Sequence, residues 1–558
     1  MARANELSTA QNDTDGLTPR QRQILQLLSE GKVNKEIAQE LQIGVGTVKQ
    51  HVVALFKRLH VSNRAMAVAR SKQQAPRSVF TSQPQDTILQ RRPCLILCIE
   101  LPPAHARLRQ LHGHLAGCAY QYDALLLARK GHVLEMVFGL SRISENEAIK
   151  ILALLQTLYP LAGSLRAVLS AGLLCASMYS QGGWSGEAIA GASLGRAREL
   201  LRQTKPEQLL IASPCCQLLE ALGMIDPQTL SQHSQADGHA CFELDGLHML
   251  YWRGERPACA RAGREQEWAM LSQALERMFA PRKAAQPCPL LLLSGETGMG
   301  KSMLCRELAN LALARQLPLM FLRVVADVDG VFLHDVICGV SADCAKLEQI
   351  WRGHGLCIID DLHLLPPAQQ IELIHTVQQR ASLLLLSARR FVPALGTLAP
   401  VQADLRLQHL PPAAIQDLIS TVWRQEAGQH TLGRQQLQQL CELAGGVPLF
   451  ALELARHCKR RGVQSGPERR NTPGLTLALI VCARLDELQL DCRLLQMAAC
   501  NPGITRNAWL QAGGAESALQ LAIASGVLRG SGSGAEMRLQ IAHPMVEMVL
   551  AWLAEGCL

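Results

Sequence analysis

The feature that most constrains the fold is an apolar strand that runs into a glycine-rich loop and then into a helix. In PLLLLSGETGMGKSMLCRELA, the residues Gly295, Gly300, Lys301 and Ser302 follow the spacing GxxxxGK[ST]. Glycines let backbone N–H groups turn towards phosphate oxygens, and the helix N-terminus adds a favourable dipole. We expect these residues and Gly298 to bind the phosphates, with Lys301 at the terminal ones and Ser302 on Mg²⁺. The segment predicts a parallel α/β sheet that binds ATP or ADP.

A second apolar strand, in GLCIIDDLHLL, ends in two carboxylates. We expect Asp360 to hold Mg²⁺ through water, and Asp361 to act as the catalytic residue by orienting the attacking water. Asp is shorter than the Glu that fast ATPases use at this place, so we expect at most slow hydrolysis. The alternative for the acidic pair alone is an exposed turn.

The N-terminal segment predicts three short helices. In LTPRQRQILQLLSEG, Thr18 is suited to cap a helix that starts at Pro19, and Gln21 completes a capping box. A second helix follows Asn34, and a third has the sequence TVKQHVVALFKRL. The apolar residues expected to face inward from the first and third helices are Ile24, Leu25, Leu28, Val48, Val52, Leu55 and Leu59.

The outer face of the third helix is polar and basic. It carries Thr47, Lys49, Gln50, Lys57 and Arg58. We expect Lys49 and Gln50 to reach base edges of double-stranded DNA, while the other three are better placed for phosphates. The alternative is a three-helix scaffold whose basic residues are merely solvated.

Residues 17–69 resemble the LuxR-type DNA-binding domain over its whole length, through LTPRQRQIL, NKEIAQEL, GTVKQHV and RLHVSNRAMAV. Gln21 stands where that family usually has Glu, and Gly44 and Val45 replace the usual polar cap and its neighbour. Neither change should prevent folding, because Gln serves in a capping box and Gly is an acceptable cap. The resemblance implies binding to a promoter or operator, a homo-oligomer, and possible contact with RNA polymerase.

The flanks of the phosphate-binding loop resemble STAND-type AAA+ switch ATPases over about residues 261–550. The resemblance rests on AGREQEWAMLSQAL, which contains Arg264, on AGGVPLFALELAR, and on Arg389 at a sensor-like position. It implies that Arg264, Gly446 and Pro448 lie beside the nucleotide. His543 in IAHPM resembles a nucleotide-contacting winged-helix histidine, although a lone histidine is more often structural.

The middle segment resembles a class III nucleotide cyclase domain that has lost its chemistry. Glu100 stands where such cyclases carry a metal-binding Asp, and His132 in GHVLEMVFG replaces the second one. Ala190 and Leu194 occupy the places of a catalytic Asn and Arg. Two-metal chemistry needs both carboxylates and the basic residue, so we expect no cyclase activity. A sensing or dimerising role remains open to such a domain, and the alternative is an unrelated α/β domain with accidental similarity.

The chain of 558 residues is too long to fold around a single hydrophobic core, so we expect several domains. We predict a multidomain α/β protein with these parts: a disordered tail at 1–16, the helix-turn-helix domain at 17–72, a linker at 73–93, the cyclase-like domain at 94–253, the ATPase domain at 254–460, and a helical or winged-helix-like domain at 461–558. The net charge of +8 does not by itself argue for nucleic acid, and the 19 cysteines lack zinc-site spacing. Without a signal peptide or an apolar stretch of membrane-span length, we expect a cytoplasmic, nucleoid-associated protein with reduced thiols and no membrane partner.

The two family resemblances together imply a DNA-binding transcription regulator whose STAND-like module acts as a nucleotide-dependent switch, with a small molecule or a protein as inducer. The alternatives are a signalling enzyme, either an active cyclase or a rapid ATPase, with DNA binding secondary, and a nucleotide-gated scaffold that binds partner proteins. The basic outer face of the third helix argues against the scaffold, and His132 argues against an active cyclase.

Overall fold

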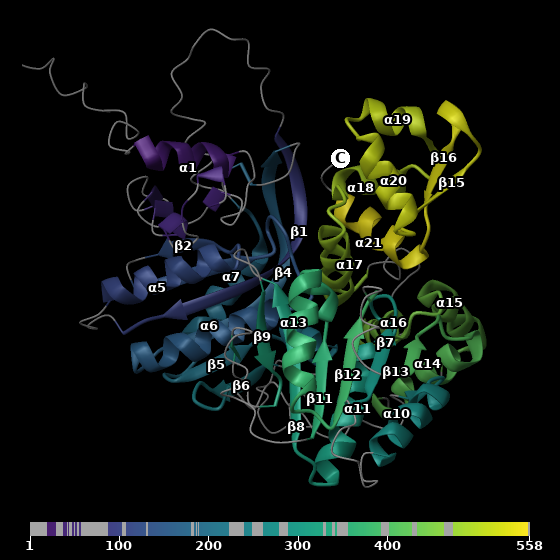
Figure 1. Ribbon diagram of the computed structural model, residues 1–558. Coiled ribbons are helices and arrows are strands. Elements are labelled where there is room, and N and C mark those ends of the chain that lie inside the picture. Colours follow the sequence, from purple (N-terminus) through teal and green to yellow (C-terminus); the bar gives the residue numbers. More distant parts are fainter. Residues whose placement is uncertain are drawn as a thin grey trace, which may run out of the picture.

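The computed structural model is a multidomain α/β protein, as predicted, with two large sheets, an N-terminal helical region and a C-terminal helical segment (Figure 1). The part of the chain that the structure describes comprises 19–29, scattered positions from 37 to 56, 87–102, 108–129, 132–179, most of 184–221, 239–247, 261–277, 288–326, 331–337, 341–342, 355–391, 401–426, 432–461 and 473–555.

The N-terminal region forms its expected core. Helix α1 spans Pro19–Ser29 and so begins where the sequence predicted. Its apolar side chains and those expected from the third helix are buried together: Ile24, Leu25, Leu28, Val48, Val52 and Leu55. Ile37 and Ala38 of the second expected helix join them. Thr18, Asn34 and Leu59 lie outside the described residues.

The middle segment forms a six-stranded sheet in the order β2-β3-β1-β4-β5-β6. Its strands are β1 (Thr87–Glu100), β2 (Leu125–Arg129), β3 (Val133–Phe138), β4 (Arg166–Tyr179), β5 (Gln208–Ile211) and β6 (Ala240–Glu243). Its helices are α5 (Leu108–Gln121), α6 (Glu147–Ala162), α7 (Ala192–Gln203) and α8 (Ser213–Ala221). Strand β1 pairs with β4 along its whole length, and its first residues lie within the predicted linker.

The second sheet has seven strands in the order β10-β9-β8-β11-β12-β7-β13. They are β7 (Leu290–Ser294), β8 (Leu319–Ala326), β9 (Val331–Asp335), β10 (Ser341–Ala342), β11 (Leu356–Asp360), β12 (Leu383–Ala388) and β13 (Val401–Arg406). Five neighbouring strands run parallel to one another: β8, β11, β12, β7 and β13. The leucine-rich sequences of β7 and β12 suit strands that are buried on both faces.

Helices surround this sheet and lead into the C-terminal segment. They are α10 (Glu265–Arg277), α11 (Lys301–Ala314), the short η4 (Leu362–Leu364), α13 (Pro367–Gln378), α14 (Pro412–Glu426), α15 (Arg434–Ala444) and α16 (Pro448–Arg461). The C-terminal segment contains α17 (Leu475–Glu487), α18 (Cys492–Cys500), α19 (Arg506–Gln511), α20 (Glu516–Ala524), α21 (Pro544–Ala554) and η7 (Gly534–Glu536). It also holds a three-stranded sheet of β14 (Ile504–Thr505), β15 (Leu528–Ser531) and β16 (Arg538–Ile541), so it is not purely helical.

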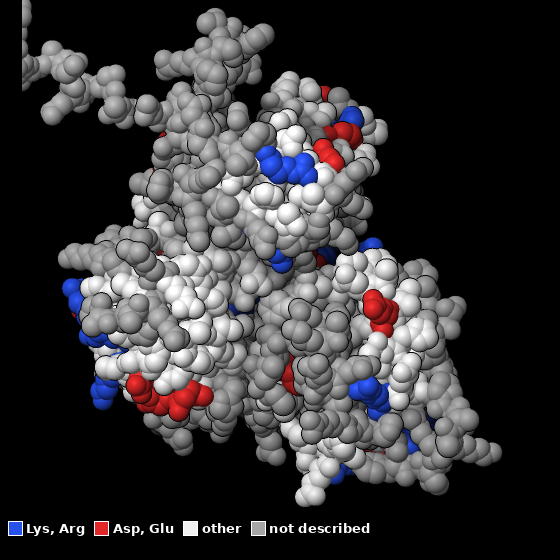
Figure 2. All heavy atoms as spheres, turned by 60° about the vertical axis from the view of Figure 1, so that its left-hand side comes forward, with Lys and Arg blue, Asp and Glu red and all other residues white. Residues whose placement is uncertain are grey.

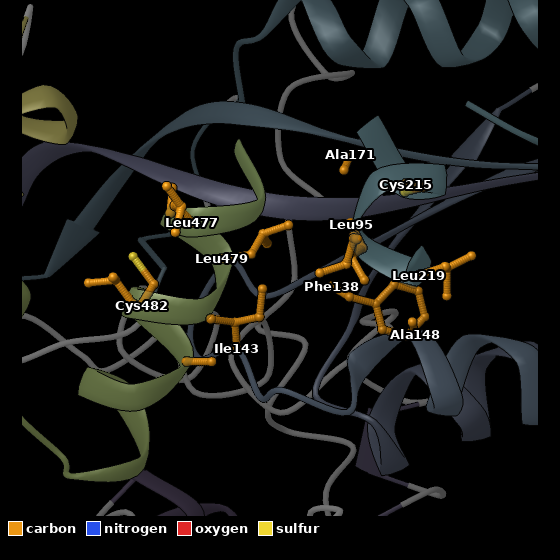
Figure 3. Close-up of a cluster of buried hydrophobic side chains, with 14 of the residues drawn as sticks. Leu95, Phe138, Ile143, Ala148, Ala171, Cys215, Leu219, Leu477, Leu479 and Cys482 are labelled. Carbon is orange, nitrogen blue, oxygen red and sulfur yellow. The ribbon is translucent and has the colours of Figure 1, made fainter. Parts of the chain in front are cut away.

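Helix α17 packs its apolar side chains against the middle sheet. Figure 3 shows Leu477, Leu479 and Cys482 of this helix in one buried cluster with Leu95 of β1 and Leu219 of α8. The cluster therefore joins two segments that lie far apart in the sequence. This core contains residues from both of the segments predicted as separate domains, 94–253 and 461–558. The domain boundaries themselves remain predictions.

A buried ion pair reinforces the same contact. The guanidinium of Arg92 on β1 is bonded to the carboxylate of Asp486 on α17, and the two side chains are 5% and 8% exposed. The same carboxylate accepts a hydrogen bond from the backbone N–H of Ile143 at 2.7 Å. Asp486 therefore accepts hydrogen bonds from two residues of the middle segment, Arg92 and Ile143.

Among the described residues on the face in Figure 2, Lys and Arg lie in small separate groups. The described cysteines are free thiols, and most are buried. Within the described ranges, no helix combines the length and the apolar character needed to cross a membrane.

The Arg92 pair gives a stability prediction. Asp486→Asn should lower the free energy of unfolding by about 3 kcal/mol, because a buried guanidinium then lacks its counter-charge while the amide oxygen still accepts from Ile143. Adding Arg92→Met should restore most of that loss. Thermal unfolding of the full chain measures both effects, and a double variant no more stable than Asp486→Asn would contradict this account.

Candidate nucleotide site

The carboxyl ends of three neighbouring parallel strands bring the predicted site residues together. Strand β12 lies between β7 and β11, with Ala388 opposite Ser294 and Leu386 opposite Ile359. The phosphate-binding loop follows β7, Asp360 ends β11, and Arg389 follows β12. These groups therefore meet at one edge of the sheet.

The loop from Gly295 to Gly300 has the conformation that a phosphate cradle requires. Gly298 and Gly300 adopt left-handed backbone angles, with φ of 79° and 96°. Lys301 begins α11, and its ammonium donates to the carbonyl oxygens of Gly295 at 2.7 Å and Glu296 at 3.0 Å. These carbonyls hold the ammonium at the mouth of the loop, where an arriving phosphate is a stronger acceptor.

The loop also contains a polar group that fits a ligand. The hydroxyl oxygen of Thr297 is buried and has no hydrogen-bond partner among the described residues. Buried polar groups are normally satisfied, so a buried hydroxyl here is suited to a bound phosphate. Burial lowers the pKa of Lys301, although the charges of Asp361 and Asp360 act in the opposite direction.

Asp360 is completely buried and held ionised. Its carboxylate pairs with Arg323 of β8 at 3.0 Å and accepts the backbone N–H of Asp361 at 3.1 Å. Burial alone would raise the pKa of Asp360, but Arg323 and a hydrogen bond from Ser302 hold it below its ordinary value. The Ser302 hydroxyl and the Asp360 carboxylate are hard oxygen donors side by side, which fits a Mg²⁺ ion.

Asp361 differs from its neighbour. It takes a left-handed conformation with φ of 59°, and its carboxylate lies 3.8 Å from the guanidinium of Arg323. Burial, and then the charge of Asp360, raise the pKa of Asp361 to about 6. At neutral pH its carboxylate is therefore mostly ionised and can accept a hydrogen bond from water.

Arg264 is buried and holds the phosphate-binding loop through hydrogen bonds to backbone carbonyls. Its guanidinium donates to the carbonyl oxygens of Met299, at 3.2 Å, and Gln408, at 2.5 Å, and it pairs with Glu267 at 3.1 Å. Met299 belongs to the phosphate-binding loop and Gln408 follows β13. The Arg264 side chain thus stabilises the loop by bonding to the loop's backbone and to the segment after β13.

The turn before α16 also packs on the loop. The backbone N–H of Leu449 donates to the carbonyl of Gly298 at 3.2 Å. Gly446 has a φ of 80°, and a Cβ atom there would lie 2.9 Å from the Cβ of His409, so only glycine fits without strain. Pro448 is the first residue of α16. The structure therefore places Gly446 and Pro448 beside the loop.

His543 connects the C-terminal segment to this turn. Its Nδ1 accepts the backbone N–H of Met545 at 3.1 Å, which caps α21, and its ring stacks edge-on against Phe450 at 5.0 Å. A Cβ atom on Gly445 would lie 2.5 Å from its Nε2, so the ring sits directly on the turn. His543 thus has a structural role here. Burial is the main reason that its pKa falls to about 4.

Three domains contribute charges to the edge of the site. The guanidinium of Arg389 pairs with Glu145 of the middle domain at 3.0 Å and also with Glu487 of α17. Arg484 of α17 pairs at 2.5 Å with Glu296 in the phosphate-binding loop. The loop is therefore in contact with the C-terminal segment, and the sensor-like Arg389 is in contact with both flanking domains.

The positions assigned by the cyclase resemblance lie in different parts of the middle sheet and in or next to α7. Glu100 at the end of β1 pairs with Arg166 at 2.7 Å, and the imidazole of His132 lies 3.8 Å from the same carboxylate. Ala190 is exposed and Leu194 is buried. Among the described residues, no cluster of three or more His, Cys, Asp or Glu side chains is arranged to hold a metal ion.

Only part of the predicted DNA-binding face is described. Thr47 and Lys49 are exposed, while Val48 between them is buried, as the helical spacing requires. Gln50, Lys57 and Arg58 lie outside the described residues. The separate roles of base contact and phosphate contact remain predictions.

Several charged residues of the site were not predicted. Arg323 interrupts the apolar strand LMFLRVVA, and a charge inside a buried strand was a signal that could have found it. Glu145, Arg484 and Glu487 lie in other domains and follow no motif. Their place beside the loop depends on how the domains pack.

Comparison with known proteins identifies two of the domains. Residues 15–71 match the model for bacterial regulatory proteins of the luxR family, and residues 262–395 match the model for an AAA ATPase domain. The chain therefore contains a LuxR-type DNA-binding domain and an ATP-binding AAA ATPase domain.

Curated relatives match at the N-terminal domain. The transcriptional regulatory protein DesR of Bacillus subtilis is 42% identical over 62 residues, 11% of this chain and 31% of the relative. The nitrate/nitrite response regulator protein NarL of Escherichia coli is 43% identical over 65 residues, 12% of this chain and 30% of the relative. The chain thus covers less than a third of each of these regulators.

Solved structures resemble other parts of the chain. A RuvB variant of Thermotoga maritima is 15% identical, with a TM-score of 0.31, and the match covers 50% of this chain and 92% of that one. The guanylyl cyclase Cya2 is 15% identical, with a TM-score of 0.20, and the match covers 24% of this chain and 81% of that one.

His543 makes the stability of the protein sensitive to acid. Its folded pKa of about 4 lies below its ordinary value of 6.5, so between these values the unfolded chain takes up a proton that the folded chain does not. Its contribution to stability is therefore complete above pH 6.5 and lost as the pH falls towards 4, by up to about 1.4 kcal/mol per pH unit.

His543→Asn should flatten this dependence, because Asn also caps a helix but does not titrate. The measurement is the unfolding midpoint of both proteins from pH 7 to pH 4. Buried His334, with a pKa of about 3, also lowers stability in acid, but it does so equally in both proteins. Parallel pH profiles would show that His543 is not the titrating group.

Proposed function

We propose that this protein is a DNA-binding transcription regulator in which the STAND-like ATPase module acts as a nucleotide-dependent switch. The LuxR-type domain supplies DNA binding, and the AAA ATPase domain supplies ATP binding. The proposal concerns how the two are coupled, because neither family match includes the middle domain or the C-terminal segment.

The observation that carries the proposal is that the middle domain contacts both the phosphate-binding edge and the DNA-binding domain. Arg389 beside the loop pairs with Glu145 of the middle domain. On the same domain, Tyr120 of α5 packs its ring against Phe56 of the DNA-binding domain, with centroids 5.4 Å apart and planes at 72°. A change in the position of the middle domain would therefore alter how the DNA-binding helices are held.

The chemistry at the site follows from the residues already described. Gly295, Gly298, Gly300 and Lys301 would bind the phosphates of ATP or ADP, with Arg264, Gly446 and Pro448 shaping the loop. Ser302 and Asp360 would hold Mg²⁺, which neutralises phosphate charge when bound. Asp361 would orient water for slow hydrolysis.

A switch requires that ATP and ADP bind two arrangements of the domains with different affinity. Arg389 supports such a difference, since the carboxylates of Glu145 and Glu487 and a terminal phosphate would all be acceptors for its guanidinium. We further propose an operator on double-stranded DNA, a homo-oligomer, contact with RNA polymerase, an unidentified inducer and a cytoplasmic place of action.

The first test is a library selection of DNA fragments by the full-length protein with ATP, with ADP and without nucleotide. We expect one sequence motif whose occupancy differs at least several-fold between ATP and ADP. Lys301→Ala should bind the same motif with no nucleotide effect, because the ammonium that meets the phosphates is gone.

The other outcomes separate the rival functions. A motif bound equally in all three conditions would leave the DNA-binding domain without a nucleotide switch. The absence of any motif would favour a signalling ATPase or a nucleotide-gated scaffold. A steep loss of DNA affinity with added salt should accompany specific binding, since phosphate contacts release counterions.

A further inference from the structure

The loop between β3 and α6 carries the middle domain into the nucleotide site. It is fixed at two points on either side of Glu145. The N–H of Ile143 donates to Asp486 of α17 at 2.7 Å, and the amide of Asn146 donates to the carbonyl of Val324 on β8 at 3.5 Å. Glu145 is therefore held by backbone and side-chain contacts to two other segments.

Glu145 acts on a guanidinium that is almost completely buried. The side chain of Arg389 is 9% exposed, and its Nη2 lies 3.0 Å from Glu145 and also bonds to Glu487. Its Nη1 is buried and has no hydrogen-bond partner among the described residues. One guanidinium thus already pairs with two carboxylates, so an anion at its free Nη1 would place a third negative charge beside Glu145 and Glu487 and weaken their pairing with Arg389.

The same charges reach the phosphate-binding lysine. Burial has the largest effect on the pKa of Lys301 and lowers it; among the nearby charges, Glu145 raises this pKa and Arg389 lowers it. A group that is close enough to influence Lys301 is also close enough to influence the terminal phosphate that Lys301 would bind.

We propose that Glu145 makes the nucleotide site select a nucleoside diphosphate over a nucleoside triphosphate. The proposal rests on the proposed function, because it assumes that the loop binds nucleotide. The carboxylate pairs with Arg389 in the present arrangement, so a diphosphate leaves this pair intact. A triphosphate adds negative charge beside Glu145 and competes with it for Arg389.

This competition links nucleotide identity to the position of the middle domain. When a terminal phosphate binds Arg389, Glu145 loses its partner, while the contacts of the loop through Ile143 and Asn146 are unchanged. The coupling is reciprocal. A ligand that draws the middle domain away from the site strengthens triphosphate binding, and the triphosphate strengthens the binding of that ligand by the same factor. The middle domain thereby acts as a sensor that uses no cyclase chemistry.

The test is the affinity of the full-length protein for Mg²⁺–ADP and for a non-hydrolysable Mg²⁺–ATP analogue, measured by calorimetry. Glu145→Gln keeps a hydrogen-bond acceptor for Arg389 but removes the charge. We expect it to strengthen binding of the triphosphate about tenfold and to change binding of the diphosphate less than threefold. Glu145→Ala should act in the same direction. Glu199→Gln, an exposed position on α7 of the same domain, is the matched control and should change neither affinity.

The outcomes are distinguishable from a failure of the proposed function. If the wild-type protein binds neither nucleotide, the proposed function fails before Glu145 is tested. If the wild type binds both and the two Glu145 variants leave the ratio of affinities unchanged, Glu145 is only an interdomain contact and the inference is wrong. A purely structural role would lower both affinities together, which is also a contrary result.

Discussion

The pairing of Arg389 with carboxylates from two other domains is the interaction on which the arrangement of the nucleotide site depends. Arg389 follows β12 at the edge of the ATPase sheet, whereas Glu145 precedes α6 and Glu487 ends α17. A buried guanidinium is stable only with its charge compensated, so this single residue requires that three segments meet. The phosphate-binding loop is part of the same arrangement through Glu296 and Arg484.

The middle domain and the start of the C-terminal segment share one hydrophobic core and the buried pair of Arg92 with Asp486. Packing of this kind makes α17 and the middle sheet move together rather than separately. A displacement at the nucleotide edge would therefore involve both. Tyr120 is on the same domain and contacts Phe56, which gives that displacement a direct physical connection to the DNA-binding helices.

The local parts of the fold were predictable because their signals are local. Helical spacing gave the buried face with Ile24 and Val52, and the strand–loop–helix pattern placed Lys301 and Ser302 correctly. Contacts between domains leave no periodic pattern, so Glu145 and Arg484 could not be found from the sequence. The role of His543 as a helix cap that rests on Gly445 depends equally on packing. The roles of Lys49, Gln50 and Asp361 remain predictions.

The central claim is that nucleotide identity at the loop reaches the DNA-binding domain through the middle domain. Hydrogen–deuterium exchange of the full-length protein, with ADP and with a non-hydrolysable ATP analogue, tests it most directly. The account predicts faster exchange with the ATP analogue in three separate places: the segment 141–147, helix α5, and helix α1 of the DNA-binding domain. A difference confined to the phosphate-binding loop and α11, with α5 and α1 unchanged, would contradict it.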